Sequence, residues 1–586
     1  MLRFLTACTL IVLMTSSLCM SANLNVVDLG AIPDGVTDNT AVFQKALDEA
    51  GKDGSIVNVP AGKYKILGNL SIPRGVTLQG TYRSAPCPLD NDPTKLTGSV
   101  LLAYAGRKSE KGAPFIELDH ASTVAGFIIT YPEWKKTDVP PVPYPPCISA
   151  KLSSENAAIL DCCLLNAYEG IKLYRSHRFL VRNIQGYPIK SGIFVDECYD
   201  IGRIENIHFW PFGINYSPDD PYCKWINLNG VAFEFARTDW QYVTNTFCFG
   251  YGVGYKFSEY KEGGCNGNFL GIGADSCQNA VIVDQAQPPG LLITNGEFVG
   301  RWSSTNAVPF VVNPKVQGKV SLNNCSFWGP IDQCVTVDSP NGQFTATGCN
   351  FLHYDINGTG SPAVRINAGS TIMQGNTFGE GQLQVAIGKK VKSAVVMGNQ
   401  APDGIIIGNG IGRKAQILGN SIGAPMMSTS AFAAYKLDIG ALGDGGFIKH
   451  WSGREPGTEW AGKGTKRWST TDGQLILPVL PNTEYSIAMD IHIPKYAFAP
   501  NAGIYAGKSC ILKFTKEGPQ TLSGTFTSGK SQTIKLDIKC RIWVPKDEIA
   551  GSNDTRKLGV GMRSVTIRVK GSKNKLYSAN TGEPIK

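Results

Sequence analysis

Short apolar–polar–apolar triplets return along most of this chain, each preceded by a small polar residue or glycine. Successive units are separated by 23, 62, 27, 29, 24, 27, 23 and 21 residues, and the longest step holds a further copy at Thr246. The units begin at Asn183, Asn206, Asn268, Asn295, Asn324, Gly348, Gly375, Gly398 and Gly419. A period in the twenties that drifts by a few residues indicates a solenoid. Alternation sends one set of side chains inward, and Asn and Gly suit the bends. The pattern therefore predicts a parallel β-helix, whose long ladder-like surface suits a polymer.

The clearest repeat covers residues 157–216, with starts at Ala157, Arg178 and Tyr199 that are 21 residues apart. A longer insertion follows, and the coils fade after Asn420.

The chain enters the solenoid through a strand, a turn and an amphipathic helix. The helix is predicted from about Thr40 to Ala50, with Val42, Phe43, Ala46 and Leu47 on one face. Laid across the first coil, such a helix would cap the open end of the solenoid.

The same segment carries a recognisable motif. It consists of Gly30-Ala31, Asp34-Gly35, Thr37-Asp38, Thr40, Val59-Pro60-Ala61-Gly62 and Tyr64. In this motif the chain resembles the pectate-lyase-like superfamily of right-handed parallel β-helix proteins, which includes rhamnogalacturonases, epimerase-like proteins and phage tailspikes. The resemblance covers roughly residues 24–425 and implies the fold. Members of the superfamily hydrolyse, eliminate or only bind, so the reaction stays open.

The predicted fold class is all-β: a right-handed parallel β-helix with an N-terminal capping helix, followed by a smaller C-terminal β-sandwich. Alternating segments separated by turns predict the sandwich. We expect core packing for its tryptophans Trp451, Trp460, Trp468 and Trp543, with carbohydrate binding as the alternative if two of them are exposed on one face. The predicted ranges are a signal peptide at 1–22, the β-helix at 23–425, a connector at 425–438, the sandwich at 439–575 and a polar tail at 576–586.

The signal peptide is predicted from Arg3, an apolar stretch from Phe4 to Met14 and small residues up to Ala22. It implies a secreted, periplasmic or extracellular protein. No other stretch is long and apolar enough to span a membrane.

Net charge is +9 without a dense Lys/Arg run, which excludes nucleic acid as the expected partner and favours an anionic polymer.

The sixteen cysteines form no CxxC pair. We expect Cys325 and Cys349 to stack inward one coil apart, with a disulfide as the alternative. Five others are expected in turns, where they could pair: Cys147, Cys198, Cys223, Cys265 and Cys277.

The candidate chemistry lies where outward side chains of the coils meet inserted loops, one of them the proline-rich stretch 83–150. Because coils lie about 4.8 Å apart, carboxylates one or two coils apart would be about 5–10 Å apart, as in glycosidases. His208 points outward between inward Ile207 and Phe209. The catalytic candidates are Glu133, Asp196, Glu197, His208 and Asp239. The substrate-binding candidates are Tyr131, Trp134, Tyr168, Glu169, Tyr187, Lys190, Trp210 and Trp240.

The function predicted from these residues is cleavage of a polysaccharide, with hydrolysis slightly favoured over β-elimination. A lyase would need a base and a cation, for which Lys190, Arg237, Tyr187 and Arg301 are candidates, with Ca²⁺ as the associated cofactor. No Ca²⁺-loop signature is visible in the sequence. The NTD, DD, GHG and RIK motifs expected of a polygalacturonase are absent from consecutive coils, so no catalytic residues are carried over from the family.

Two other functions remain open. A glycan-binding adhesin of tailspike type would bind without releasing product and would form a homotrimer. A uronate epimerase acting on a polymer would exchange the proton at C5 without cutting the chain.

Overall fold

The computed structural model describes residues 24–585 except 90, 91, 93, 302–306, 380, 382, 403, 422–426, 428 and 457–463. The predicted signal peptide at 1–22 lies outside the described residues. The internal contacts of the chain divide it into two compact units, residues 1–217 and 218–586. The two units meet at residues 217 and 218, whereas the predicted boundary between β-helix and sandwich lies at 425–439.

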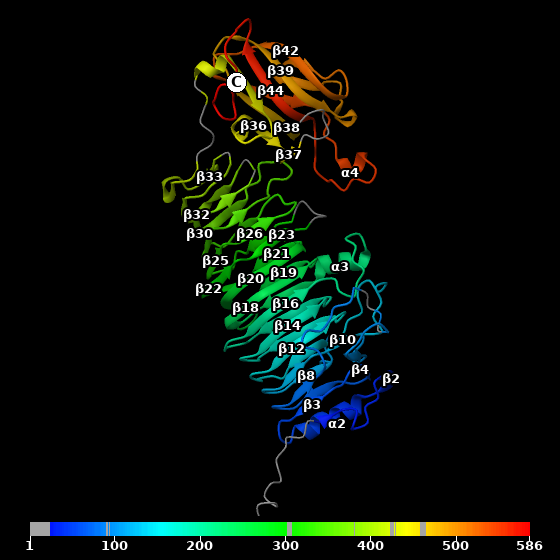
Figure 1. The fold of residues 1–586 in the computed structure, drawn as a ribbon. Coiled ribbons are helices and arrows are strands. Elements are labelled where there is room, and N and C mark those ends of the chain that lie inside the picture. Colours follow the sequence, from blue (N-terminus) through cyan, green and yellow to red (C-terminus); the bar gives the residue numbers. More distant parts are fainter. Residues whose placement is uncertain are drawn as a thin grey trace, which may run out of the picture. The chain divides into compact units, whose positions relative to one another are not determined.

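The first unit is a coil of stacked parallel strands (Figure 1), which confirms the predicted β-helix. The strand pairings divide it into three faces. The first face consists of β1 (Leu24–Asn25), β3 (Ile56–Asn58), β6 (Thr77–Gln79), β9 (Thr123–Ala125) and the first halves of β12 (Ala158–Leu164), β14 (Leu180–Gly186) and β16 (Arg203–Phe209). The second face consists of β2 (Asp34–Asp38), β4 (Gly62–Ile66), β7 (Ser99–Ala103), β10 (Ile128–Thr130) and the second halves of β12, β14 and β16. The third face consists of β5 (Leu70–Ile72), β8 (Ile116–Leu118), β11 (Pro146–Ala150), β13 (Glu169–Tyr174) and β15 (Ser191–Asp196).

The repeated Asn marks the bend between the first and second faces. Asp161, Asn183 and Asn206 occupy equivalent places in β12, β14 and β16, with φ of +56°, +56° and +54°. Asn and Asp tolerate this left-handed conformation better than other residues with a Cβ. The amide of Asn183 also donates to the Asp161 carboxylate at 2.7 Å. The sequence repeat therefore records one backbone bend in each coil.

The capping helix α2 (Thr40–Ala50) has the predicted bounds. Its buried face consists of Phe43, Ala46, Leu47 and Ala50, and it packs on β1, β3 and β5. The side chain of Gln44 exchanges two hydrogen bonds with the backbone of Ser71, at 3.0 and 2.9 Å. The helix thus covers the N-terminal end of the coil, as predicted.

The prediction of one long insertion at 83–150 is wrong, because this stretch contains β7 to β11. Most of these strands have only three residues, too few to show alternation, and prolines interrupt the stretch between them. The longer connections between these strands are residues 104–115 and 131–145.

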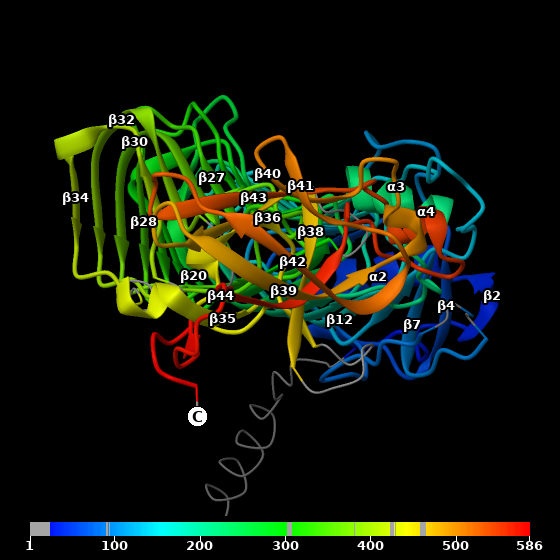
Figure 2. The same ribbon diagram turned by 90° about the horizontal axis from the view of Figure 1, so that it is seen from above.

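The second unit opens with α3 (Pro221–Asn229) and continues as parallel strands. These are β17 (Val231–Phe235), β18 (Thr238–Phe249), β19 (Val253–Phe257), β20 (Cys265–Cys277), β21 (Asn279–Val283), β22 (Ala286–Thr294), β23 (Glu297–Gly300), β24 (Phe310–Val312), β25 (Lys319–Asn323), β26 (Ser326–Trp328), β27 (Val335–Val337), β28 (Gln343–Thr347), β29 (Asn350–Phe351), β30 (Val364–Gln374), β31 (Thr377–Phe378), β32 (Val385–Met397), β33 (Ile407–Asn409) and β34 (Ala415–Leu418), with the short helix η1 (Gly412–Lys414). Figure 2 shows β30, β32 and β34 side by side.

One predicted repeat position in this unit is wrong. Asn268 pairs with Tyr242 within the straight part of β20, whereas the bend lies at Gly271 (φ +62°), opposite Asn245 (φ +53°). Glycine replaces Asn at this bend because it reaches positive φ without steric cost.

An antiparallel sheet with its own apolar core follows in the same unit. Its elements are η2 (Thr429–Ala433), β35 (Ala434–Asp438), η3 (Gly445–Phe447), β36 (Ile448–Trp451), β37 (Glu455–Pro456), β38 (Thr465–Pro478), β39 (Glu484–Ile493), η4 (Lys495–Ala497), β40 (Gly503–Ala506), β41 (Ser509–Lys513), β42 (Gly518–Thr527), β43 (Thr533–Lys539), α4 (Pro545–Glu548), β44 (Gly561–Val569) and β45 (Tyr577–Ser578). The end of the predicted connector is β35, and the start of the predicted tail is β45, which pairs with β35.

The tryptophans of this sheet pack inside it. Trp451, Trp468 and Trp543 are at most 6% exposed, which confirms the predicted core use for these three. Trp460 lies outside the described residues.

The cysteines are free thiols among the described residues. Cys325 and Cys349 are buried, as expected for an inward stack. The five cysteines predicted in turns are all buried, and Cys147, Cys223, Cys265 and Cys277 lie within strands or α3.

Candidate functional site

The loops that join the second and third faces of the first unit follow one another along one edge of the coil. We call this edge the site edge. It comprises residues 104–115, 131–145, 165–168, 187–190 and 210–217. Because every coil passes through it at the same place, residues far apart in sequence come together there.

Glu110 is the centre of a polar cluster on the site edge. Tyr168 donates its hydroxyl proton to one carboxylate oxygen of Glu110 at 2.7 Å, and the ammonium group of Lys190 donates to the other at 2.8 Å. The same ammonium group lies 5.4 Å from the centre of the Tyr168 ring. Glu169 follows Tyr168 directly at the start of β13 and is half-buried. Tyr168, Glu169 and Lys190 were predicted as substrate-binding residues, whereas Glu110 was missed.

The surroundings of Glu110 and Glu169 move the pKa values of their carboxyl groups in opposite directions. Hydrogen bonds from Lys190 and Tyr168 lower the pKa of Glu110. Burial raises the pKa of Glu169, and the negative charge of Glu110 adds to this rise against the opposing charges of Lys172 and Lys190. Two neighbouring carboxyl groups whose pKa values diverge are the arrangement from which an acid and a base are made.

A second cluster of charged residues lies on the site edge, where Arg107 is close to two carboxylates. The Arg107 guanidinium is 3.8 Å from the Glu133 carboxylate and 3.9 Å from that of Asp138. Tyr144 is buried beside them, and burial raises the pKa of its hydroxyl to about 12. Glu133, a predicted catalytic residue, thus lies on the site edge with a half-exposed side chain.

His208 and Trp210 lie where the next coil reaches this edge. His208 points outward, as predicted, while Ile207 and Phe209 are buried. The centre of the His208 ring lies 5.3 Å from the centre of the Phe212 ring, in an edge-on contact. The centre of the Trp210 ring lies 5.5 Å from the centre of the Phe212 ring. Burial lowers the pKa of His208, so the ring is mostly neutral at pH 7.

Asp196 and Glu197, two predicted catalytic residues, do not lie on the site edge. They end β15 and begin the turn toward β16, at the opposite side of the third face from Lys190. The Glu197 carboxylate is 2.6 Å from Arg175 and accepts from Tyr174 at 2.8 Å, while Asp196 accepts from the backbone of Glu197. Both side chains are buried.

Tyr131 and Tyr187, two predicted substrate-binding residues, are 2% and 0% exposed, so their rings do not face a ligand. Tyr131 packs on Tyr144 and Phe115 instead of facing a ligand. Trp134 is half-buried on the site edge.

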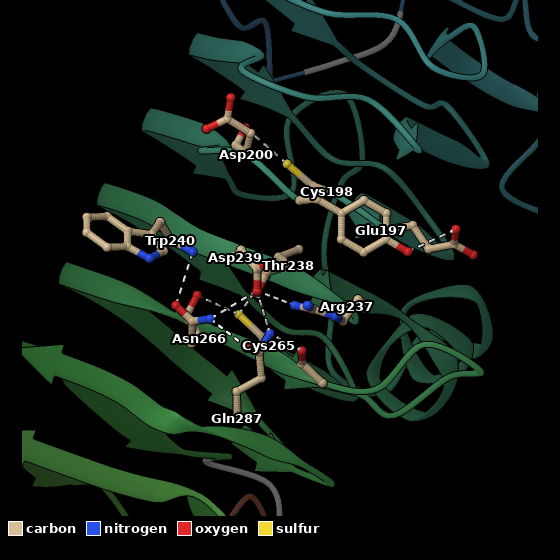
Figure 3. A network of polar contacts seen from close by, with 12 residues as sticks. Glu197, Cys198, Asp200, Arg237, Thr238, Asp239, Trp240, Cys265, Asn266 and Gln287 are labelled. Carbon is tan, nitrogen blue, oxygen red and sulfur yellow. Dashed lines mark hydrogen bonds and ion pairs between the residues drawn. The ribbon is translucent and has the colours of Figure 1, made fainter.

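Asp239 and Trp240 belong to the second unit. The Asp239 carboxylate pairs with Arg237 and accepts from Gln287 at 2.9 Å and Asn266 at 3.2 Å (Figure 3). Trp240 is 63% exposed, and its backbone N–H donates to Asn266. The Asp239 side chain is thus held by a ladder of amides, whereas the Trp240 ring is open to a ligand.

Within the described part of the chain, no three His, Cys, Asp or Glu side chains gather as a metal site. No helix there is long and apolar enough to cross a membrane.

Fold and site together define a parallel β-helix protein with a carboxylate, tyrosine and lysine cluster on one edge of its coil. Residues 23–98 match the family model described as rhamnogalacturonase A/epimerase, pectate lyase-like, which confirms the resemblance carried by the opening motif. The mannuronan C5-epimerase AlgE4 of Azotobacter vinelandii is 35% identical over an alignment of 105 residues that covers 16% of this chain and 19% of that protein.

Solved structures with similar folds include the N-terminal fragment of gene product 12 of bacteriophage Phi29, at 13% identity and a TM-score of 0.44 over 71% of this chain and 73% of that one. A family 28 exopolygalacturonase of Yersinia enterocolitica has 12% identity and a TM-score of 0.32 over 68% and 76% of the two chains.

Proposed function

We propose that this protein is a carbohydrate-active enzyme that cleaves the glycosidic bonds of an anionic polysaccharide by hydrolysis. The observation that carries the proposal is the pair Glu110 and Glu169, two neighbouring carboxyl groups with pKa values moved in opposite directions. Glycoside hydrolysis requires one protonated and one ionised carboxyl group at the scissile bond.

The chemistry assigns a role to each member of the cluster. Glu169 keeps its proton to higher pH and donates it to the leaving oxygen. Glu110 stays ionised beside Lys190 and acts as base or nucleophile. The ring of Tyr168, which is mostly buried, holds Glu110 in place through its hydroxyl group.

The charge of the site edge supports an anionic polymer. Its loops carry the exposed residues Lys108, Lys111 and Lys135 in addition to Lys190. Basic side chains along a cleft or edge raise the local concentration of an acidic substrate.

A second candidate is epimerisation of a uronate within the polymer. Tyr168 and Lys190 both bind Glu110, so one position holds groups able to take and return a proton. The partial match to a mannuronan C5-epimerase supports the same reaction class.

The test is incubation of residues 23–586 with acidic and neutral polysaccharides. We expect new reducing ends without the ultraviolet absorbance of an unsaturated uronate. Both signals together would indicate elimination, and hydrogen exchange at C5 without new ends would indicate epimerisation. Glycan binding with none of these signals, above all from a trimer, would contradict the proposal and favour an adhesin.

A further inference from the structure

The described residues of the segment 81–98 form no helix or strand, and they pack on the outer surface of β7, β10 and β12. Beneath it runs a column of outward side chains in adjacent strands: Val100, Ile128, Cys163, Gln185 and His208. The first three are at most 1% exposed because Ala85 and Leu96 of the loop pack on them. The loop is therefore part of the wall of the coil.

Two thiols meet at this contact. The sulfur of Cys87, in the loop, is 3.1 Å from that of Cys163, in β12, and also donates to Gln185 at 2.8 Å. A disulfide bond is about 2.05 Å long, so closing it requires the partly exposed Cys87 side chain to move by about 1 Å.

We propose that Cys87 and Cys163 form a disulfide that fastens the 81–98 loop to the β-helix. Cys87 is the thiol that an oxidant reaches, because Cys163 is fully buried. Its sulfur attacks a disulfide oxidant such as oxidised glutathione and releases one thiol. The sulfur of Cys163 then displaces the second thiol, so that two protein thiols are oxidised and one disulfide is reduced to two thiols.

This pair differs from the other cysteine contacts of the chain. Cys325 and Cys349 stack inside the core on neighbouring coils, where neither is exposed to an oxidant. Cys87 and Cys163 are 76 residues apart, so their bond would tie an otherwise irregular loop to a strand.

The fastened loop also supports the site edge. The backbone carbonyl of Pro88 accepts from the N–H of Gly213 at 2.9 Å, in the turn that carries Trp210 and Phe212. The disulfide would therefore hold this turn in place. The proposal does not depend on which reaction the protein catalyses.

The experiment compares residues 23–586 as wild type, Cys87→Ser and Cys510→Ser after treatment with oxidised or reduced glutathione. Cys510 is exposed and serves as the matched control. After oxidation and denaturation, we expect a peptide joining Cys87 to Cys163 in wild type and in Cys510→Ser, and none in Cys87→Ser. The exposed Cys510, where present, takes up glutathione as a mixed disulfide and is counted separately.

A second readout is the rate of tryptic cleavage at Arg83 and Lys95, both exposed in the loop. Oxidation should slow it by about tenfold or more in wild type and leave Cys87→Ser unchanged, because the bond suppresses local opening. Two free thiols at Cys87 and Cys163 after oxidation, or a bond from either one to another cysteine, would overturn the proposal.

Discussion

Replacing Glu169 with Gln is expected to lower the turnover of the cleaved polysaccharide by about a hundred- to ten-thousandfold, the usual contribution of a general acid. Gln keeps the size and polarity of the side chain and removes only its proton. The fold should be unaffected, because the half-buried Glu169 side chain forms no ion pair among the described contacts. Initial rates of reducing-end release at saturating substrate measure the effect.

The companion variant Glu110→Gln should lose activity to a similar extent and should change the pH profile in a different way. Because the pKa of Glu110 is lowered and that of Glu169 is raised, the active form predominates between the two values. Loss of Glu110 removes the acidic limb of the profile, and loss of Glu169 removes the alkaline limb.

Glu155→Gln is the matched control. Glu155 is 35% exposed and pairs with one arginine, Arg178, much as Glu110 is 40% exposed and pairs with Lys190. It lies in the turn between β11 and β12, on the opposite side of the third face from the site edge. Equal activity in all three variants would show that the site edge does not carry the chemistry.

Much of the fold follows from the sequence because one local rule repeats. Each coil needs a bend, and only Asn, Asp and Gly adopt it at low cost, so the bend leaves a visible period. The amphipathic helix α2 and the outward direction of His208 follow from local periodicity in the same way.

The site was predicted only in part, because acidic residues at strand ends look alike in sequence. Glu169 and Glu197 both flank third-face strands, yet they lie at opposite ends of those strands. Assigning a residue to an edge requires the strand bounds, which the repeat gives only to within a few residues. Glu110 was missed for a related reason: it lies 58 residues before Tyr168, in an irregular loop without a periodic signal.

The second unit holds an acidic group with a consequence for stability. Asp355 is 5% exposed, and its carboxyl group accepts from the backbone N–H groups of Gly360 and Ser361 at 3.0 and 3.1 Å. Burial raises its pKa to about 7, with a further contribution from the charge of Asp332. At neutral pH the folded protein therefore holds a buried carboxyl group at the point of ionisation.

The sign of the pH effect follows from this rise. The carboxyl group binds its proton more tightly in the folded than in the unfolded state, so its contribution to stability is complete below the unfolded pKa of 3.8. That contribution falls as pH rises from about 4 to 7 and is lost above the pKa of the folded state. The free energy of unfolding therefore decreases by roughly 4 kcal/mol between the two limits.

Asp355→Asn is accordingly expected to remove this pH dependence and to raise the melting temperature at pH 8, while changing it little at pH 4. The Asn oxygen still accepts from Gly360 and Ser361, and Asn suits the backbone at this position, where φ is +49°. Asp472→Asn is the matched control, since Asp472 also has a positive φ of +62° but is exposed. Thermal unfolding between pH 4 and 9 distinguishes the two causes of stabilisation. If the melting temperature rises only at pH 8 and only in Asp355→Asn, the buried charge is the cause. If it rises equally at every pH in both variants, the cause lies in the backbone, and this result would contradict the raised pKa.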